Sequence, residues 1–137
     1  MKLTNGEIFD SKEHLQGLIP QTMPALSSLG LQKLTQAINL LLVPIEETRM
    51  KLLKEYGEVD KLNPQTIRIE PMNLVPDENN EGRMLSVPNP KAEAFVKDWM
   101  EIRAVENDVE LEIVTVPSTI EISVLGLTAL EKFIKVK

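Results

Sequence analysis

The side chains that could do chemistry in this chain are one histidine and a short run of carboxylates. His14 is the only histidine and cysteine is absent. These counts exclude a multi-histidine site and a cysteine-ligated metal. Four carboxylates occupy every second position near the carboxyl end, namely Glu106, Asp108, Glu110 and Glu112. Their oxygens could bind a divalent cation, but the run lacks the Asp-x-Asp-x-Asp-Gly pattern of a calcium loop. We interpret it as the solvent face of a strand and predict no metal site, no cofactor and no enzyme activity.

Nucleotide and nucleic-acid ligands have no visible signature either. The six glycines never form Gly-x-x-x-x-Gly-Lys-Ser/Thr or Gly-x-Gly-x-x-Gly. Lysine and arginine number 15 against 21 acidic residues, a net charge of −6, and the basic residues are scattered along the chain. Binding to phosphates needs a local basic surface. We therefore expect no direct nucleic-acid binding, and an acidic surface could instead face a basic protein partner.

The length and composition predict one soluble domain covering residues 1–137. A chain of this size can build a single core without disulfides or a structural metal. Hydrophobic residues make up 42% and charged residues 26% of the chain, and no segment approaches the roughly 18 consecutive apolar residues of a membrane span. Residues 1–9 carry Lys2 without an apolar stretch behind it, so we expect no secretory signal, no membrane association and an intracellular protein.

One long amphipathic helix is the strongest structural prediction, and we place it at Leu29–Tyr56. Apolar residues recur there at helical spacings of three and four, namely Leu31, Leu34, Ile38, Leu41, Ile45, Leu52 and Tyr56. Pro44 interrupts the stretch, but the stripe continues in register on both sides, so we predict a continuous helix bent at Pro44. Ser27 or Ser28 could cap its start, and Gly57 could end it in the left-handed conformation.

The remaining elements are shorter. Asn5-Gly6 predicts a tight type I′ turn between Lys2–Thr4 and Glu7–Phe9, followed by a short helix capped by Asp10 with Glu13. Thr66–Glu70 and Arg83–Val87 predict a hairpin whose tip, Pro76–Gly82, is exposed.

A second helix and further strands follow. Asn89-Pro90 predicts a helix through Glu106, with an inner face made of Ala92, Phe95, Val96, Trp99 and Ile102. Strands are expected at Glu110–Val116 and at 120–124, where Ile120, Ile122 and Val124 alternate, and Leu127–Ile134 is expected to form a closing helix.

These elements predict an α+β fold. The long helix bent at Pro44 and the Asn89–Glu106 helix should pack on a small, mainly antiparallel sheet.

Partner-binding residues are predicted on the long helix. Leu40, Leu42 and Val43 lie outside the main stripe, so either the helix is covered on several sides or this face meets another chain, including a second copy. Glu46 and Glu47 lie beside them at spacings that also suit ion pairs within the helix.

Several segments together carry a resemblance to a family. They are Met1–Phe9, Pro44–Arg49 leading to Lys54–Gly57, and Ile120–Ser123 with Leu130–Ile134. In order and spacing they resemble a family of small proteins of unknown activity encoded by tailed bacteriophages and prophages, over nearly the whole chain. The resemblance implies a phage gene product, found in the host-cell cytoplasm or in the virion, and supplies no catalytic residues.

The sequence therefore predicts a phage-encoded, non-enzymatic protein that binds another protein, either in virion assembly or in the modulation of a host enzyme. The alternative is a small metal-dependent enzyme that uses the carboxylates from Glu106 to Glu112.

Overall fold

The computed structural model describes residues 1–137, which divide into two compact units. Unit 1 is Met1–Ile45 with Arg103–Lys137, and unit 2 is Glu46–Ile102. The elements are β1 (Lys2–Thr4), α1 (Asn5–Leu18), α2 (Ala25–Tyr56), β2 (Glu58–Val59), β3 (Ile67–Arg68), β4 (Met72–Pro76), β5 (Met84–Pro88), α3 (Pro90–Arg103), β6 (Glu106–Asp108), β7 (Val114–Val116), α4 (Val124–Leu130) and β8 (Ile134–Val136). Helices and short strands together confirm the α+β class. No helix is long and apolar enough to cross a membrane.

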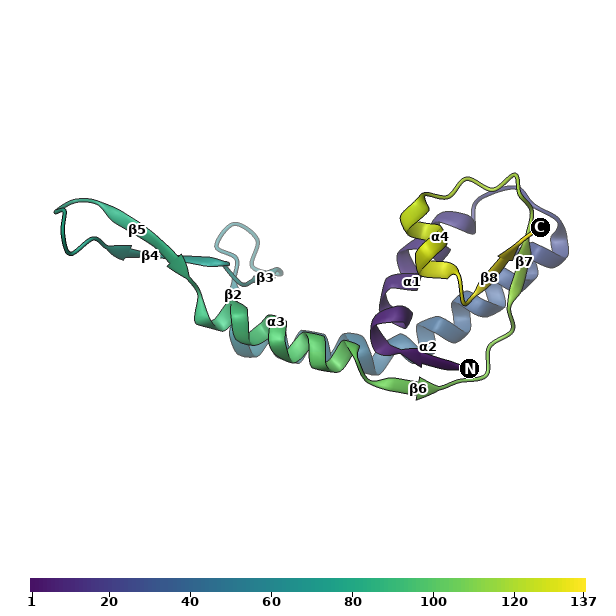
Figure 1. The fold of residues 1–137 in the computed structure, drawn as a ribbon, viewed down its shortest axis with the longest axis horizontal. Helices are drawn as coiled ribbons and strands as arrows, with labels where there is room; N and C mark the ends of the chain where they lie inside the picture. The colour runs from purple at the N-terminus through teal and green to yellow at the C-terminus, as the bar shows by residue number, and fades with distance from the viewer. The chain divides into compact units, whose positions relative to one another are not determined.

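The strands form four separate two-stranded pairs, three of them antiparallel. In unit 1, β1 pairs with β6 antiparallel and β7 pairs with β8 parallel. In unit 2, β2 pairs with β3 and β4 with β5, both antiparallel. Helix α4 packs against α1 in unit 1 (Figure 1). The mainly antiparallel pairing is as predicted, but the pairs remain separate and do not join into one sheet.

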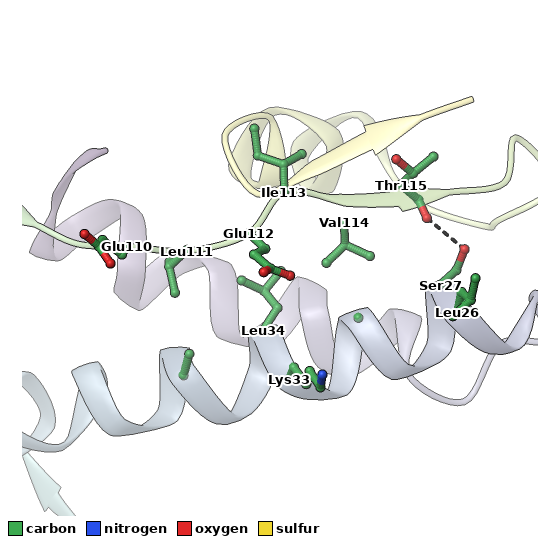
Figure 2. Close-up of a pocket in the computed structure, with 12 residues that line it drawn as sticks. Leu26, Ser27, Lys33, Leu34, Glu110, Leu111, Glu112, Ile113, Val114 and Thr115 are labelled. Carbon is green, nitrogen blue, oxygen red and sulfur yellow. Dashed lines mark hydrogen bonds between the residues drawn. The ribbon is translucent and has the colours of Figure 1, made fainter.

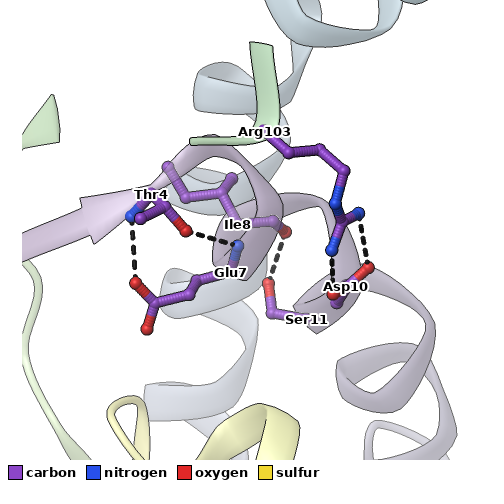
Figure 3. A network of polar contacts seen from close by, with 6 residues as sticks. All are labelled: Thr4, Glu7, Ile8, Asp10, Ser11 and Arg103. Atoms are coloured by element: carbon purple, nitrogen blue, oxygen red, sulfur yellow. Dashed lines mark hydrogen bonds and ion pairs between the residues drawn. The ribbon is translucent and has the colours of Figure 1, made fainter. Parts of the chain in front are cut away.

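Helix α1 begins earlier than predicted, and the Asn5-Gly6 hairpin turn is wrong. Thr4 caps the helix: its Oγ1 accepts from the Glu7 backbone N–H at 3.1 Å, and the Glu7 carboxylate accepts from the Thr4 N–H at 3.0 Å (Figure 3). This Thr-x-x-Glu capping box satisfies two backbone donors that would otherwise be unpaired. Partial burial raises the pKa of Glu7, but hydrogen bonds from Lys132 and Thr4 outweigh it and leave the pKa below its usual value.

Asp10, predicted to cap this helix, instead binds an arginine. Arg103 Nη1 and Nη2 donate to the two Asp10 carboxylate oxygens at 3.0 and 2.6 Å (Figure 3). Hydrogen bonding to Asp10 raises the pKa of Arg103. This bidentate pair connects the end of α3 to α1 within unit 1.

Helix α2 is continuous through Pro44, as predicted, but both ends differ from the prediction. It begins at Ala25, so Ser27 and Ser28 lie inside it. Gly57 is not left-handed, since Gly82 is the only residue with a positive φ. The Gly57 N–H still donates to the Leu53 carbonyl at 2.7 Å. A Cβ at Gly57 would lie 2.7 Å from Ile67 Cγ2, so a glycine is needed there for the close approach of β3.

The buried stripe of α2 differs from the predicted one at one position. Its buried residues are Leu31, Leu34, Ile38, Leu42 and Ile45, whereas Leu41 is only half-buried. They belong to the hydrophobic core, whose other members are Leu3, Ile8, Leu15, Leu18, Val114, Val116, Leu130, Phe133 and Ile134. All of these residues lie in unit 1.

Unit 2 contributes no buried hydrophobic side chain. Helix α3 has no buried residue: four of its five predicted inner residues are half-buried, and Val96 is exposed. Asn89 caps it as predicted, with Oδ1 accepting from the Lys91 N–H at 3.0 Å. Arg49 of α2 lies over the ring of Trp99 at 5.7 Å from its centroid. Contacts of this kind hold α2 and α3 together without a closed apolar core.

The predicted hairpin in unit 2 had the wrong first strand. Met84–Pro88 pairs with Met72–Pro76, and the segment predicted as its partner, Thr66–Glu70, contributes only Ile67–Arg68, which pairs with Glu58–Val59. The tip between β4 and β5 is exposed, as predicted, except for the half-buried Asp77.

The elements near the carboxyl end have other bounds than those predicted. Only Val114–Val116 of the predicted Glu110–Val116 strand is a strand, and the helix covers Val124–Leu130 and not Leu127–Ile134. The Ser123 hydroxyl accepts from the Gly126 N–H at 3.0 Å and starts this helix. The expected strand over 120–124 is therefore replaced by a loop and a helix cap.

The Tyr56–Asp98 hydrogen bond should be visible in an alkaline titration. Tyr56 Oη donates to Asp98 Oδ2 at 2.7 Å, and this bond raises the pKa of Tyr56 to about 12. Tyr56 is the only tyrosine, so ultraviolet absorbance reports it alone. Because the pKa of Tyr56 is higher in the folded than in the unfolded chain, its hydrogen bond stabilises the fold fully below about pH 10, the ordinary tyrosine value. That contribution is lost as the pH rises through about 12.

Asp98→Asn should return the midpoint towards 10, whereas Glu55→Gln should move it only slightly because Glu55 is the smallest cause of the shift. An unchanged midpoint in Asp98→Asn would contradict the contact.

Candidate functional site

An open groove in unit 1 is the best-formed candidate site. It runs between the first half of α2 and the extended segment Glu110–Thr115, with a volume of about 470 Å³ (Figure 2). The residues that line it are Leu26, Ser27, Gly30, Lys33, Leu34, Ala37, Glu110, Leu111, Glu112, Ile113, Val114 and Thr115.

A close approach at one end fixes the two walls. Ser27 Oγ donates to the Thr115 carbonyl at 2.8 Å. A Cβ at Gly30 would lie 3.1 Å from Val114 Cγ1, so only a glycine fits there without displacing Val114. Val114 is itself buried and held by its N–H bond to the Phe133 carbonyl at 3.0 Å. The groove is therefore closed at Gly30 and anchored to the core through β7.

Apolar and polar side chains line the groove together, and several of the polar ones are charged. Gly30 and Ala37 are small and lie seven residues apart, hence on one face of α2. Leu111 points towards α2, whereas Ile113 points away from it (Figure 2). Lys33 on α2 and Glu110 and Glu112 on the other wall carry opposite charges. Such a mixture suits a peptide better than a strongly charged small ligand.

The extended wall has unused backbone groups. No backbone hydrogen bond involves the N–H or C=O groups of Glu110–Ile113. Pairing stops on either side of this segment, at Val109, whose N–H donates to the Met1 carbonyl, and at Val114. A run of unpaired donors and acceptors at the surface is a template for a further strand. The wall can therefore accept main-chain hydrogen bonds from another chain.

The predicted partner-binding residues separate into exposed and buried ones. Leu40 is 76% exposed and Val43 50% exposed. Leu40 lies three residues after Ala37 and so continues the groove side of α2 by one turn. Leu42 is 1% exposed and belongs to the core, so its prediction as a partner contact was wrong. Glu46 and Glu47, in unit 2, are exposed.

The structure does not gather the carboxylates into a metal site. Glu106 and Asp108 lie on β6, opposite Thr4 and Lys2 of β1. Glu110 and Glu112 line the groove instead. No three histidine and carboxylate side chains lie close enough to hold a metal ion together. His14, on α1, faces α4, where its Nδ1 would lie 3.1 Å from a Cβ at Gly126.

Sequence reasoning missed the groove itself. The small residues Gly30 and Ala37 were a usable signal, because their spacing leaves a shallow strip along a helix otherwise lined with leucines. The second wall gave no such signal. Its alternating residues predict a continuous strand over Glu110–Val116, which does not indicate that the segment lines a groove.

The chain matches no protein-family profile, no curated protein and no solved structure. The geometry of the groove is therefore the basis for what it can bind.

Proposed function

We propose that this is a non-enzymatic, phage-encoded protein that binds another protein through the groove between α2 and Glu110–Thr115. The observation that carries the proposal is the combination of a groove that contains apolar side chains with an unpaired extended wall. The partner is a virion component during assembly or a host enzyme that is modulated, and the protein acts in the host-cell cytoplasm or in the virion. The phage setting comes from the family resemblance of the sequence.

The binding mode we propose is strand addition. An extended segment of the partner pairs with the backbone of Glu110–Ile113, and its alternate side chains enter the groove. Main-chain hydrogen bonds supply affinity in this mode, and the side-chain pockets supply specificity. The space between Ala37 and Leu111 accepts apolar side chains, and Leu40 extends the contact by one turn.

Charge selects among such segments. The whole protein carries −6, which favours association with basic partner surfaces. Lys33 opposes the two glutamates across the groove, so a segment with one basic residue facing Glu110 or Glu112 fits better than a uniformly acidic one.

Capture from phage-infected cells tests the proposal with a matched pair of variants. Ala37→Glu places a charged, longer side chain in the groove, whereas Gln32→Glu adds the same charge to an exposed position of α2 outside it. We expect the Ala37→Glu chain to lose its partner at least tenfold, about 1.4 kcal/mol, and the Gln32→Glu chain to retain it. Circular dichroism checks that both variants fold.

Equal capture by both variants would show that the groove is not the binding site. A captured partner that is turned over chemically would favour the enzyme alternative.

A further inference from the structure

A second surface, in unit 2, carries an inference that is independent of the groove. The hairpin formed by β4 and β5 pairs with no other strand. Its apolar side chains are exposed, among them Met72 at 45%, Leu74 at 67% and Met84 at 52%. An isolated two-stranded hairpin is marginally stable in water, and stability usually requires three or more strands.

The central positions of both edges of this hairpin lack the usual protection against pairing. Natural edge strands are blocked by charged residues, bulges or prolines within the strand. The segments Met72–Val75 and Met84–Val87 contain no charge and no proline, and prolines occur only at their ends, Pro76 and Pro88. In an antiparallel pair of identical strands only the residue on the two-fold axis meets its own copy, so an uncharged residue is needed at that position.

The register shows which backbone groups are free. The Asp77 N–H donates to the Arg83 carbonyl and the Asn89 N–H to the Pro71 carbonyl. Bonded and non-bonded pairs alternate along an antiparallel ladder. Asp77–Arg83 and Pro71–Asn89 are bonded pairs, so Leu74–Ser86 and the pairs two positions away are non-bonded. In non-bonded pairs the backbone N–H and C=O groups point away from the partner strand. Those of Met84 and Ser86 therefore point outward from β5, and those of Met72 and Leu74 point outward from β4.

We propose that two copies of this chain associate through β5, antiparallel about a two-fold axis at Leu85, to form a four-stranded sheet. Met84 of one copy then lies opposite Ser86 of the second copy. By symmetry, Ser86 of the first copy lies opposite Met84 of the second, so two equivalent pairs form. Each such pair exchanges two N–H···O bonds, so every outward N–H of β5 is used. Leu85 meets Leu85 of the second copy at the axis, whereas the same arrangement on β4 would oppose Asn73 to itself.

Two further features favour a second copy as the occupant. On the Leu85 face, Val75 and Val87 share the same side of the ribbon, so association produces a continuous apolar strip from both copies. Continued past β5, this register places Glu81 of one copy opposite Asn89 of the other, two residues before Lys91, in a helix start that also contains Glu93. Negative charge is favourable at a helix amino terminus.

Single cysteines test the register directly, because the chain has none of its own. Residues in a non-hydrogen-bonded pair have Cα atoms about 4.5 Å apart, within the range that a disulfide spans. Leu85→Cys should therefore oxidise in a glutathione buffer to a covalent dimer of twice 15.4 kDa as the main product. Val87→Cys, two pairs from the axis, and Asn73→Cys, the β4 counterpart, should remain single chains on a non-reducing gel.

Light scattering on the unmodified full chain should give twice 15.4 kDa under the same conditions. A monomeric mass, or cross-linking of Asn73→Cys or Val87→Cys as complete as that of Leu85→Cys, would overturn the proposal. Neither result bears on capture of a partner by the groove.

Discussion

Leu42→Ser should lower the free energy of unfolding by about 3–5 kcal/mol, whereas Leu40→Ser should change it by less than about 0.5 kcal/mol. The two leucines lie two residues apart on the same helix, but Leu42 is 1% exposed and Leu40 is 76% exposed. Replacing Leu42 removes its packing with the core and leaves a hydroxyl in an apolar site. A loss of this size removes a large part of the 5–15 kcal/mol that is typical of a domain.

Urea unfolding of both variants, followed by circular dichroism, measures the difference. Each variant removes the same side chain from the same helix, so helix propensity cancels between them. A small effect for Leu42→Ser would mean that the helix presents a different face to the core, and the groove would then be misplaced as well.

This pair also shows how far periodicity determines a core. The spacing of apolar residues was sufficient to predict α2 and its continuity through Pro44. It was not sufficient to choose between Leu41 and Leu42, because both lie three or four residues from Ile38 and Ile45. The side of the helix that is covered depends on segments distant in the sequence, such as β7 with Val114, which periodicity within α2 does not describe.

The errors at the amino terminus come from competing local signals. Asn5-Gly6 is a strong turn pair, but Thr4 and Glu7 form a capping box over the same residues. The helix forms because its next turns bury Ile8, Ser11 and Leu15, whereas a hairpin would leave them exposed. Burial beyond the local window therefore decided between two valid patterns.

The groove could not be predicted because its walls come from distant parts of the chain. Gly30 and Val114 are in contact although more than eighty positions separate them. The sequence left open whether Leu40, Leu42 and Val43 are covered within the domain or meet another chain, and in the structure Leu40 and Val43 are exposed whereas Leu42 is buried. It gave no indication that Glu110–Ile113 would remain unpaired, because alternation predicts a strand without predicting its neighbour.

The last prediction concerns the stability of the two units. In dilute solution, the free energy of opening that is measured by amide hydrogen exchange should be at least about 3 kcal/mol lower for α3 than for the part of α2 near Ile38 and Leu42. All buried hydrophobic side chains lie in unit 1, and each fully buried leucine or isoleucine contributes about 1.5–3 kcal/mol. Unit 2 relies instead on partly exposed contacts such as Tyr56 with Asp98 and Arg49 over Trp99.

Hydrogen exchange measured by mass spectrometry resolves the two sets of amides, and the fluorescence of Trp99, the only tryptophan, follows unit 2 separately during urea unfolding. Tyr56→Phe serves as the matched perturbation: it removes one hydroxyl, should weaken protection in α3, and should leave the amides around Ile38 unchanged. If α3 and the core instead share one opening free energy and one unfolding midpoint, residues 1–137 behave as the single cooperative domain that the length predicts. The contacts between α2 and α3 would then be much stronger than their exposure implies.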